Sequence, residues 1–161
     1  GTRYAILRYF NACGADPDGE LGEWHEPETH LIPRALLAAS GRIPELEIFG
    51  DDYETEDGTC VRDYVHVWDL AKAHVGAARH LLSGGENVAL NLGSGRGSSI
   101  RQILDSIEHT TRRKVPISIR PRREGDPAAL YSDAMQTLDE IDKQQKMDDY
   151  LILPFPPLHY H

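Results

Sequence analysis

The sequence predicts an α/β fold in which short strands alternate with amphipathic helices. Two observations support this class. Apolar residues recur at helical spacing in three segments, and four short β-prone runs lie before or after those segments. The 161 residues contain too few strands for a complete doubly wound sheet. We therefore expect only part of such a fold.

The first predicted elements are a strand and a helix separated by a long loop. Residues 5–10 are β-prone and run into a loop over residues 14–28 that is rich in Asp, Gly and Pro. Thr29 is a candidate N-cap with Pro33 in the first turn of the helix that follows. Apolar residues then recur at i, i+3, i+4 and i+7 until Gly41 ends the helix. The pattern predicts a helix with one buried face.

The middle of the chain predicts a second strand and a long helix. Residues 46–49 form a short β-prone run, and the polar segment 50–58 follows as a loop. Residues 67–82 place apolar side chains along one helical stripe that ends at Gly84 and Gly85. The segment 59–71 joins a β-rich run to this helix.

The last strongly patterned region predicts a strand, a helix and a further strand. Residues 88–92 are apolar and lead into the glycine-rich turn 93–97. Ser99 and Gln102 then have the spacing of a capping box at the start of a helix. Residues 115–119 alternate apolar and small polar side chains, as in a strand. The pattern weakens from about residue 136.

Composition and charge narrow the classes of partner. Asp and Glu number 26 against 17 Lys and Arg, for a net charge of −9, so we expect no nucleic-acid partner. Cys13 and Cys60 form no CxxC pair, which predicts a reduced, cytoplasmic chain without a structural disulfide. No apolar run approaches the roughly 20 residues of a membrane span, and no signal-peptide pattern opens the chain, so no membrane partner is expected.

The sequence holds no strong cofactor or metal motif of its own. The run Gly93–Gly97 follows a strand and opens a helix, but Ser98 breaks the G-x-G-x-x-G spacing, so a tight structural turn is favoured over a dinucleotide site. The histidines His66, His74 and His80 lack ligand spacing on a helix, and His159 and His161 lie at the chain end. We predict no metal site.

Five segments resemble UDP-glucose 4-epimerases in the same order, and the resemblance spans residues 4–133. It is carried most clearly by Val-Arg-Asp-Tyr-Val-His-Val-x-Asp-Leu-Ala at 61–71; the other four segments are 7–14, 29–33, 49–58 and 121–126. The resemblance implies an extended short-chain dehydrogenase/reductase of Rossmann type, a homodimer in the intact enzyme, which uses NAD to oxidise C4 of a UDP-hexose transiently. Residues 1–135 would be its C-terminal, UDP-sugar-binding portion and 136–161 a divergent or truncated tail.

The same resemblance implies the roles of individual residues. Two arginines would contact the diphosphate, an acid the ribose, an aromatic the uracil, and one side chain would limit space at the sugar 2-position. The substrate-binding residues so implied are Asn11, His30, Leu31, Phe49, Arg62, Arg123, Asp126 and Leu130, while Tyr9 would lie near the nicotinamide. From residue type alone, each arginine is also explained by pairing with an acid such as Asp63 or Asp126, and Tyr9 and Phe49 by packing in strands.

No catalytic residue is expected within the chain. The resemblance places the NAD glycine loop and the catalytic Tyr-x-x-x-Lys in a part of the enzyme that this sequence does not match, and no tyrosine here has lysine four residues on. We therefore expect these 161 residues to be inactive alone and to expose apolar faces such as Ile100, Ile103, Leu104 and Ile107. The alternatives are a non-catalytic nucleotide-sugar-binding module, or a fragment of a nucleotide-sugar dehydratase or reductase.

Overall fold

The computed structural model describes residues 1–132, and the chain divides into two compact units. Unit 1 contains Gly1–Gly22, Asp63–Arg96 and residues 131–132, whereas unit 2 contains Glu23–Arg62 and Gly97–Leu130. Each unit therefore combines segments that are far apart in the sequence. The predicted tail 136–161 lies outside the described residues.

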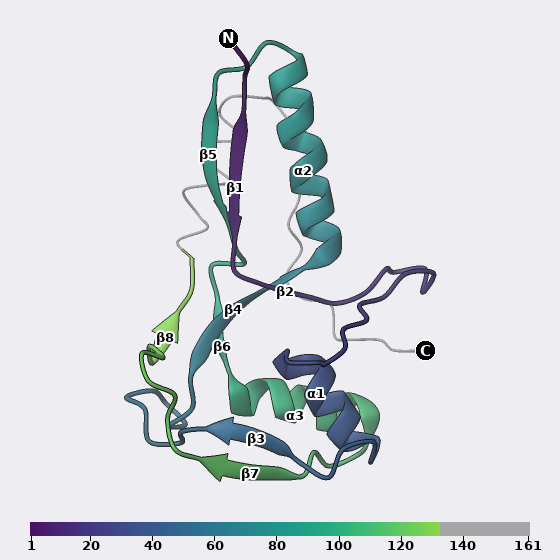
Figure 1. Cartoon of the computed structure of the whole chain (residues 1–161), viewed down its shortest axis with the longest axis vertical. Helices are drawn as coiled ribbons and strands as arrows, with labels where there is room; N and C mark the ends of the chain where they lie inside the picture. Colours follow the sequence, from purple (N-terminus) through teal and green to yellow (C-terminus); the bar gives the residue numbers. More distant parts are fainter. Residues whose placement is uncertain (133–161) are drawn as a thin grey trace. The chain divides into compact units, whose positions relative to one another are not determined.

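Unit 1 packs one long helix on a parallel pair of strands. Strand β1 (Ala5–Tyr9) pairs with β5 (Val88–Leu92), with Leu7 opposite Leu90, and helix α2 (Val67–Leu82) packs beside β1 (Figure 1). Parallel strands require a crossover connection, and α2 lies in that connection. The buried residues of this unit form one cluster: Val65, Leu70, Leu90 and Leu92.

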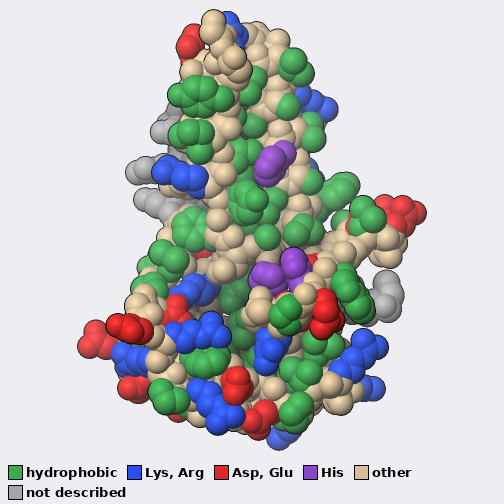
Figure 2. Space-filling model, viewed as in Figure 1, with side chains coloured by type: hydrophobic (Ala, Val, Ile, Leu, Met, Phe, Trp, Pro, Cys, Tyr) green, Lys and Arg blue, Asp and Glu red, His purple; other side chains and the backbone are tan. Residues whose placement is uncertain are grey.

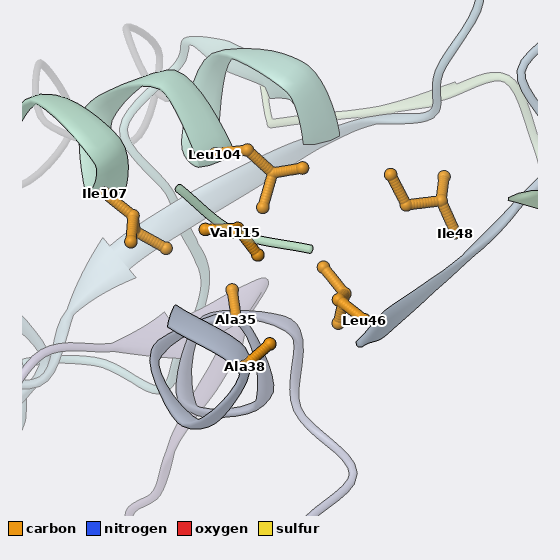
Figure 3. Packing of buried hydrophobic residues seen from close by; sticks show 7 residues of the cluster. All are labelled: Ala35, Ala38, Leu46, Ile48, Leu104, Ile107 and Val115. Carbon is orange, nitrogen blue, oxygen red and sulfur yellow. The ribbon is translucent and has the colours of Figure 1, made fainter. Parts of the chain in front are cut away.

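Unit 2 has its own core between two helices and a second pair of strands. Helices α1 (Leu31–Ala39) and α3 (Ile100–Thr111) contact each other, and strands β3 (Leu46–Phe49) and β7 (Ile117–Arg120) pair in parallel. Figure 3 shows their apolar side chains converging between the elements. The buried residues of this core are Ala35, Ala38, Leu46, Ile48, Leu104, Ile107 and Val115.

The expectation that α3 exposes its apolar face is wrong. Leu104 and Ile107 are buried, and Ile100 and Ile103 pack against the same core. Helix α1 and strand β3 cover that face, so unit 2 buries it without the rest of an enzyme. Large apolar side chains are instead exposed in unit 1, where Figure 2 shows hydrophobic surface over β1, β5 and α2; examples are Ile6, Val75 and Leu82.

Strand β4 (Val61–His66) is paired in both units, through different residues. Its residues 64–66 pair in parallel with β2 (Asn11–Cys13) within unit 1, and residues 61–62 pair in parallel with β8 (Ala129–Leu130) within unit 2. Strand β6 (Gly97–Ser99) also pairs with β4. The sequence did not predict β2, β6 or β8, because strands of two or three residues are too short to show alternation.

Helix starts agree with the sequence in one case and differ in another. The predicted capping box of α3 is confirmed: Ser99 Oγ accepts from Gln102 N at 3.1 Å, and Gln102 Oε1 accepts from Ser99 N at 2.9 Å. The N-cap of α1 is His30 and not Thr29, and no side chain caps that helix.

Strand β7 begins two residues later than expected; Val115, which was expected to start it, packs in the core just before the strand. Within the described residues, no helix has the length and apolarity needed to cross a membrane.

Asp57 connects the 50–58 loop to the start of α3. Its carboxylate accepts hydrogen bonds from Thr59 N at 2.9 Å, from Thr59 Oγ1 at 2.6 Å and from Ser99 Oγ. Burial alone would raise the pKa of Asp57, but the hydrogen bonds from Ser99 and Thr59 outweigh it and lower the pKa below its ordinary value. Ionised Asp57 therefore stabilises unit 2.

We expect Asp57→Asn to destabilise the chain by about 1 to 3 kcal/mol near neutral pH, because an amide cannot accept all three hydrogen bonds. A depressed folded-state pKa stabilises the protein above the unfolded-state value, and this stabilisation disappears as the pH falls through the folded-state pKa. The difference from the natural chain should therefore narrow below about pH 4. Urea denaturation at several pH values measures it, and a difference that grows on acidification would contradict the role of the ionised carboxylate.

Candidate functional site

Arg62 occupies a half-buried position beside β8. Its Nη2 donates to Asp126 Oδ1 at 2.9 Å, and its Nη1 donates to Pro127 O at 2.9 Å and to Val61 O at 2.8 Å. The Arg62 side chain is 15% exposed and that of Asp126 is 33% exposed. Of the two acids considered from sequence as partners for Arg62, the structure pairs it with Asp126.

Arg62 keeps donors for a further ligand. A guanidinium carries five N–H donors, and the three contacts above use both hydrogens of Nη1 and one of Nη2. Within residues 1–132, the Nε–H and the second Nη2–H have no acceptor. A free Nε–H and a free Nη2–H can each donate to an oxygen of an anion.

Arg123 and its neighbour Arg122 have different partners. The Arg123 guanidinium lies 3.9 Å from the centre of the Phe49 ring, and no acid of the described residues pairs with it. Arg122 lies 4.2 Å from the Tyr53 ring, and its Nε donates to Asp52 Oδ1 at 2.7 Å. That hydrogen bond from Arg122 lowers the pKa of Asp52. Within the described part of the chain, Arg123 is thus a stacked cation without a carboxylate partner.

A tight turn connects the Arg123–Phe49 contact to the Arg62–Asp126 ion pair. Asp126 N donates to Arg123 O at 3.4 Å, which closes a four-residue turn. Gly125 has φ +79°, a left-handed conformation that glycine adopts without the cost of a Cβ. The turn presents Arg123 to Phe49 at one end and Asp126 to Arg62 at the other. Unit 2 therefore gathers four of the residues predicted from sequence: Phe49, Arg62, Arg123 and Asp126.

The remaining predicted residues of unit 2 have separate environments. Leu130 is 51% exposed on β8, opposite Arg62 in the strand register. His30 precedes α1, and its Nδ1 contacts Glu28 Oε1 at 2.9 Å. The side chain of Leu31 packs against the core of unit 2. Its side chain is therefore structural.

Two predicted residues belong to unit 1. Asn11 begins β2, and its Nδ2 donates to the backbone oxygen of Asp63 at 3.1 Å. Tyr9 ends β1 with its ring 52% exposed and approaches the His74 ring edge-on, with the centroids 6.2 Å apart. Tyr9 is therefore exposed, and the alternative that it packs in the core of a strand is wrong.

Asp63 has a structural role that the sequence interpretation missed, since it considered this residue only as a partner for an arginine. It is fully buried, and its carboxylate accepts five hydrogen bonds: from Ser94 N, Ser94 Oγ, Gly95 N, Ser132 N and Ser132 Oγ, at 2.6 to 3.3 Å. A Cβ on Gly93 would overlap Ser132 Oγ and the Asp63 carboxylate. Gly93 therefore allows the 93–97 turn to lie close to the Asp63 carboxylate. This turn has a structural role in the chain's own fold. The sequence feature that could have indicated this role is the position of Asp63 in a β-rich run, where a charged side chain is unusual unless it has partners.

Comparison with known proteins identifies the family. Residues 1–93 match the model of the NAD dependent epimerase/dehydratase family. The chain belongs to this family. A UDP-glucose 4-epimerase of Rhizobium meliloti (strain 1021) is 58% identical to this family member over 132 residues, which are 82% of this chain and 40% of the relative. The chain thus spans about 40% of the length of the curated relatives it matches.

Solved structures of family members agree with the α/β fold. The UDP-glucose 4-epimerase from Brucella ovis in complex with NAD is 62% identical, with a TM-score of 0.83 over 86% of this chain and 43% of that one. The enzyme from Bifidobacterium longum in complex with NAD+ and UDP is 41% identical, with a TM-score of 0.78 over 88% of this chain and 41% of that one. The predicted Rossmann-type class is confirmed.

Asp63→Asn is expected to destabilise the chain by about 2 kcal/mol or more, because an NH2 group would face backbone N–H donors that cannot reorient. Asp69→Asn is the matched control, since Asp69 pairs with Lys72 on the exposed surface of α2. Urea denaturation of the two variants measures the difference. Equal stability of the two variants would refute the structural role of the Asp63 network.

Proposed function

We propose that residues 1–135 form the C-terminal, UDP-sugar-binding part of a UDP-glucose 4-epimerase. The observation that supports this most directly is the 123–126 turn, which places two arginines, an acid and an aromatic ring within unit 2. These are the groups that a nucleoside diphosphate requires. The relatives described above support the same assignment, and one solved relative contains NAD+ and UDP.

In this proposal Arg62 and Arg123 bind the diphosphate. Guanidinium is always charged near neutral pH and binds two oxygens at once, so it suits phosphate better than the ammonium of lysine. The Nε–H and one Nη2–H of Arg62 supply such donors, as does the guanidinium of Arg123, which pairs with no acid among residues 1–132. Because the chain has a net charge of −9, an anion depends on this local group of arginines for attraction.

Asp126 and Phe49 then bind the nucleoside. Asp126 uses Oδ1 for Arg62, so Oδ2 remains to accept hydrogen bonds from the ribose hydroxyls. The Phe49 ring, already stacked on Arg123, offers an apolar border for the uracil. The Arg62–Asp126 ion pair need not break for UDP to bind, because Arg62 has further N–H donors and Asp126 has a second carboxylate oxygen.

The other assignments rest on the resemblance. Asn11 and His30 would donate to the diphosphate sugar, Leu31 would act through its backbone N–H because its side chain is in the core, and Tyr9 would lie near the nicotinamide. Leu130 exposes a branched side chain beside Arg62, and we propose that it favours hexoses over their bulkier 2-N-acetyl forms.

The reaction proposed for the intact protein is the interconversion of UDP-galactose and UDP-glucose. NAD supplies a hydride acceptor for transient oxidation at C4. The residues of this chain bind UDP while the sugar presents each face in turn, so their binding energy holds the intermediate in place. The intact protein is proposed to be a cytoplasmic homodimer.

UDP titration of the chain by calorimetry tests the arginine assignment. Arg62→Met and Arg123→Met should each weaken UDP binding about tenfold or more, because phosphate oxygens lose a charge-assisted donor worth about 1.5 to 3 kcal/mol. Arg122→Met is the control, since Arg122 is committed to Asp52 and Tyr53. If Arg122→Met weakens binding as much as Arg123→Met, or Arg62→Met leaves it unchanged, the assignment is wrong.

We expect the purified 161-residue chain with added NAD to show no conversion of UDP-galactose to UDP-glucose in a coupled assay. None of its tyrosines has lysine four residues on, so no Tyr-x-x-x-Lys pair removes the proton from the sugar hydroxyl. Measurable turnover would overturn the view that this chain binds substrate without performing the chemistry.

A further inference from the structure

Two Glu-x-His pairs meet in the loop before α1. Glu23 and His25 form one pair, and Glu28 and His30 form the other, five residues later. His25 Nε2 lies 2.8 Å from Glu23 Oε1, and His30 Nδ1 lies 3.2 Å from the same oxygen and 2.9 Å from Glu28 Oε1. The two imidazole rings are 5.0 Å apart. All four residues belong to unit 2.

Hydrogen bonding between these side chains does not account fully for the arrangement. His30 Nδ1 faces two carboxylate oxygens but carries at most one hydrogen, so a single N–H bond serves only one of them well. Glu23 Oε1 lies between both imidazoles. With neutral imidazoles the group carries two negative charges and no cation. The guanidinium of Arg34 donates from Nη1 to the backbone oxygen of Glu28 at 3.3 Å and not to either carboxylate of the group.

We propose that Glu23, His25, Glu28 and His30 bind a divalent transition-metal ion of the zinc class. One donor atom each from Glu23, His25 and His30 already lies within 4.8 Å of the other two. Two imidazole nitrogens and two carboxylate oxygens make a four-donor set that zinc accepts in tetrahedral geometry. Metal–ligand bonds of about 2.0 Å separate tetrahedral donors by roughly 3.3 Å. Three of the six donor separations are 2.8 to 3.2 Å and require only small shifts outward. Glu28 lies outside the group of donors that are all within 4.8 Å of one another, so its carboxylate must move to join the other three.

The surroundings of the cluster fit an ion that enters from solvent. The side chains of His25 and His30 are 52% and 53% exposed, whereas that of Glu28 is 13% exposed. Glu28 Oε1 accepts the backbone N–H of His30 at 2.7 Å, and this hydrogen bond anchors the Glu28 carboxylate. Imidazole donors favour zinc over magnesium or calcium, which prefer oxygen ligands.

The metal site shares one residue, His30, with the proposed UDP site. The donor atom of His30 here is Nδ1, so Nε2 is the nitrogen that would contact a diphosphate sugar. The prediction of no metal site rested on the spacing of His66, His74 and His80 and on the position of His159 and His161 at the chain end. The loop conformation brings the four proposed ligands together, and the sequence alone does not specify that conformation.

Zinc titration of the full chain, in competition with a chromophoric chelator, tests the proposal. The chain should bind one equivalent, and Glu23→Gln and His25→Gln should each lower the affinity at least tenfold. Replacement of zinc by Co2+ should give the strong visible absorption of a four-coordinate site. His109→Gln, which removes an exposed imidazole of α3 in the same unit, should leave both readouts unchanged.

A second control addresses the histidines near the chain end. If His159→Gln with His161→Gln abolishes zinc binding while His25→Gln does not, or if Glu23→Gln binds zinc as tightly as the natural chain, the proposed site is wrong. His25→Gln should not change UDP affinity. Loss of zinc binding with intact UDP binding, or the reverse, therefore separates this proposal from the proposed function.

Discussion

The buried carboxylate of Asp63 imposes the strictest physical requirement in unit 1. A charge without solvent contact must receive hydrogen bonds from the protein, and Asp63 receives five. Three of them come from the turn after β5, which can approach only because residue 93 is glycine. The backbone oxygen of the same residue accepts from Asn11. The middle of β4, the turn after β5 and the start of β2 are thus held by one residue.

Arg62, which precedes Asp63 in the sequence, is held in place by groups of unit 2. Adjacent side chains on a strand point to opposite faces, so Arg62 and Asp63 are directed apart although they are consecutive. Arg62 is held by Asp126 and by two carbonyl oxygens, and two of its N–H donors have no acceptor within residues 1–132. A half-buried arginine that is held in place but not saturated loses less side-chain entropy on binding an anion than a mobile one. This preorganisation is the physical reason to place the diphosphate there.

Within residues 1–132, unit 2 forms a hydrophobic core from its own elements. Helices α1 and α3 cover the β3–β7 pair and bury the apolar face that we had expected to be exposed (Figure 3). Charged side chains of both signs cover β3 and β7, and Arg120 pairs with Glu45 and Glu47 (Figure 2). Unit 1 keeps more of its apolar surface exposed, including Ile6 and Leu82.

The sequence by itself determined the α/β class, the three helices and the longer strands, because periodic apolar patterns and capping residues such as Ser99 are local signals. The resemblance of the 61–71 segment also identified the family that the comparisons then established. Only the tertiary structure decided the short strands β2, β6 and β8, since their hydrogen bonds depend on a partner strand and not on their own residues. It also decided that Arg62 pairs with Asp126, that Arg123 stacks on Phe49, and that two Glu-x-His pairs converge. Each of these contacts is between side chains whose spacing in the chain has no regular period, so their proximity depends on how the chain folds and not on local sequence.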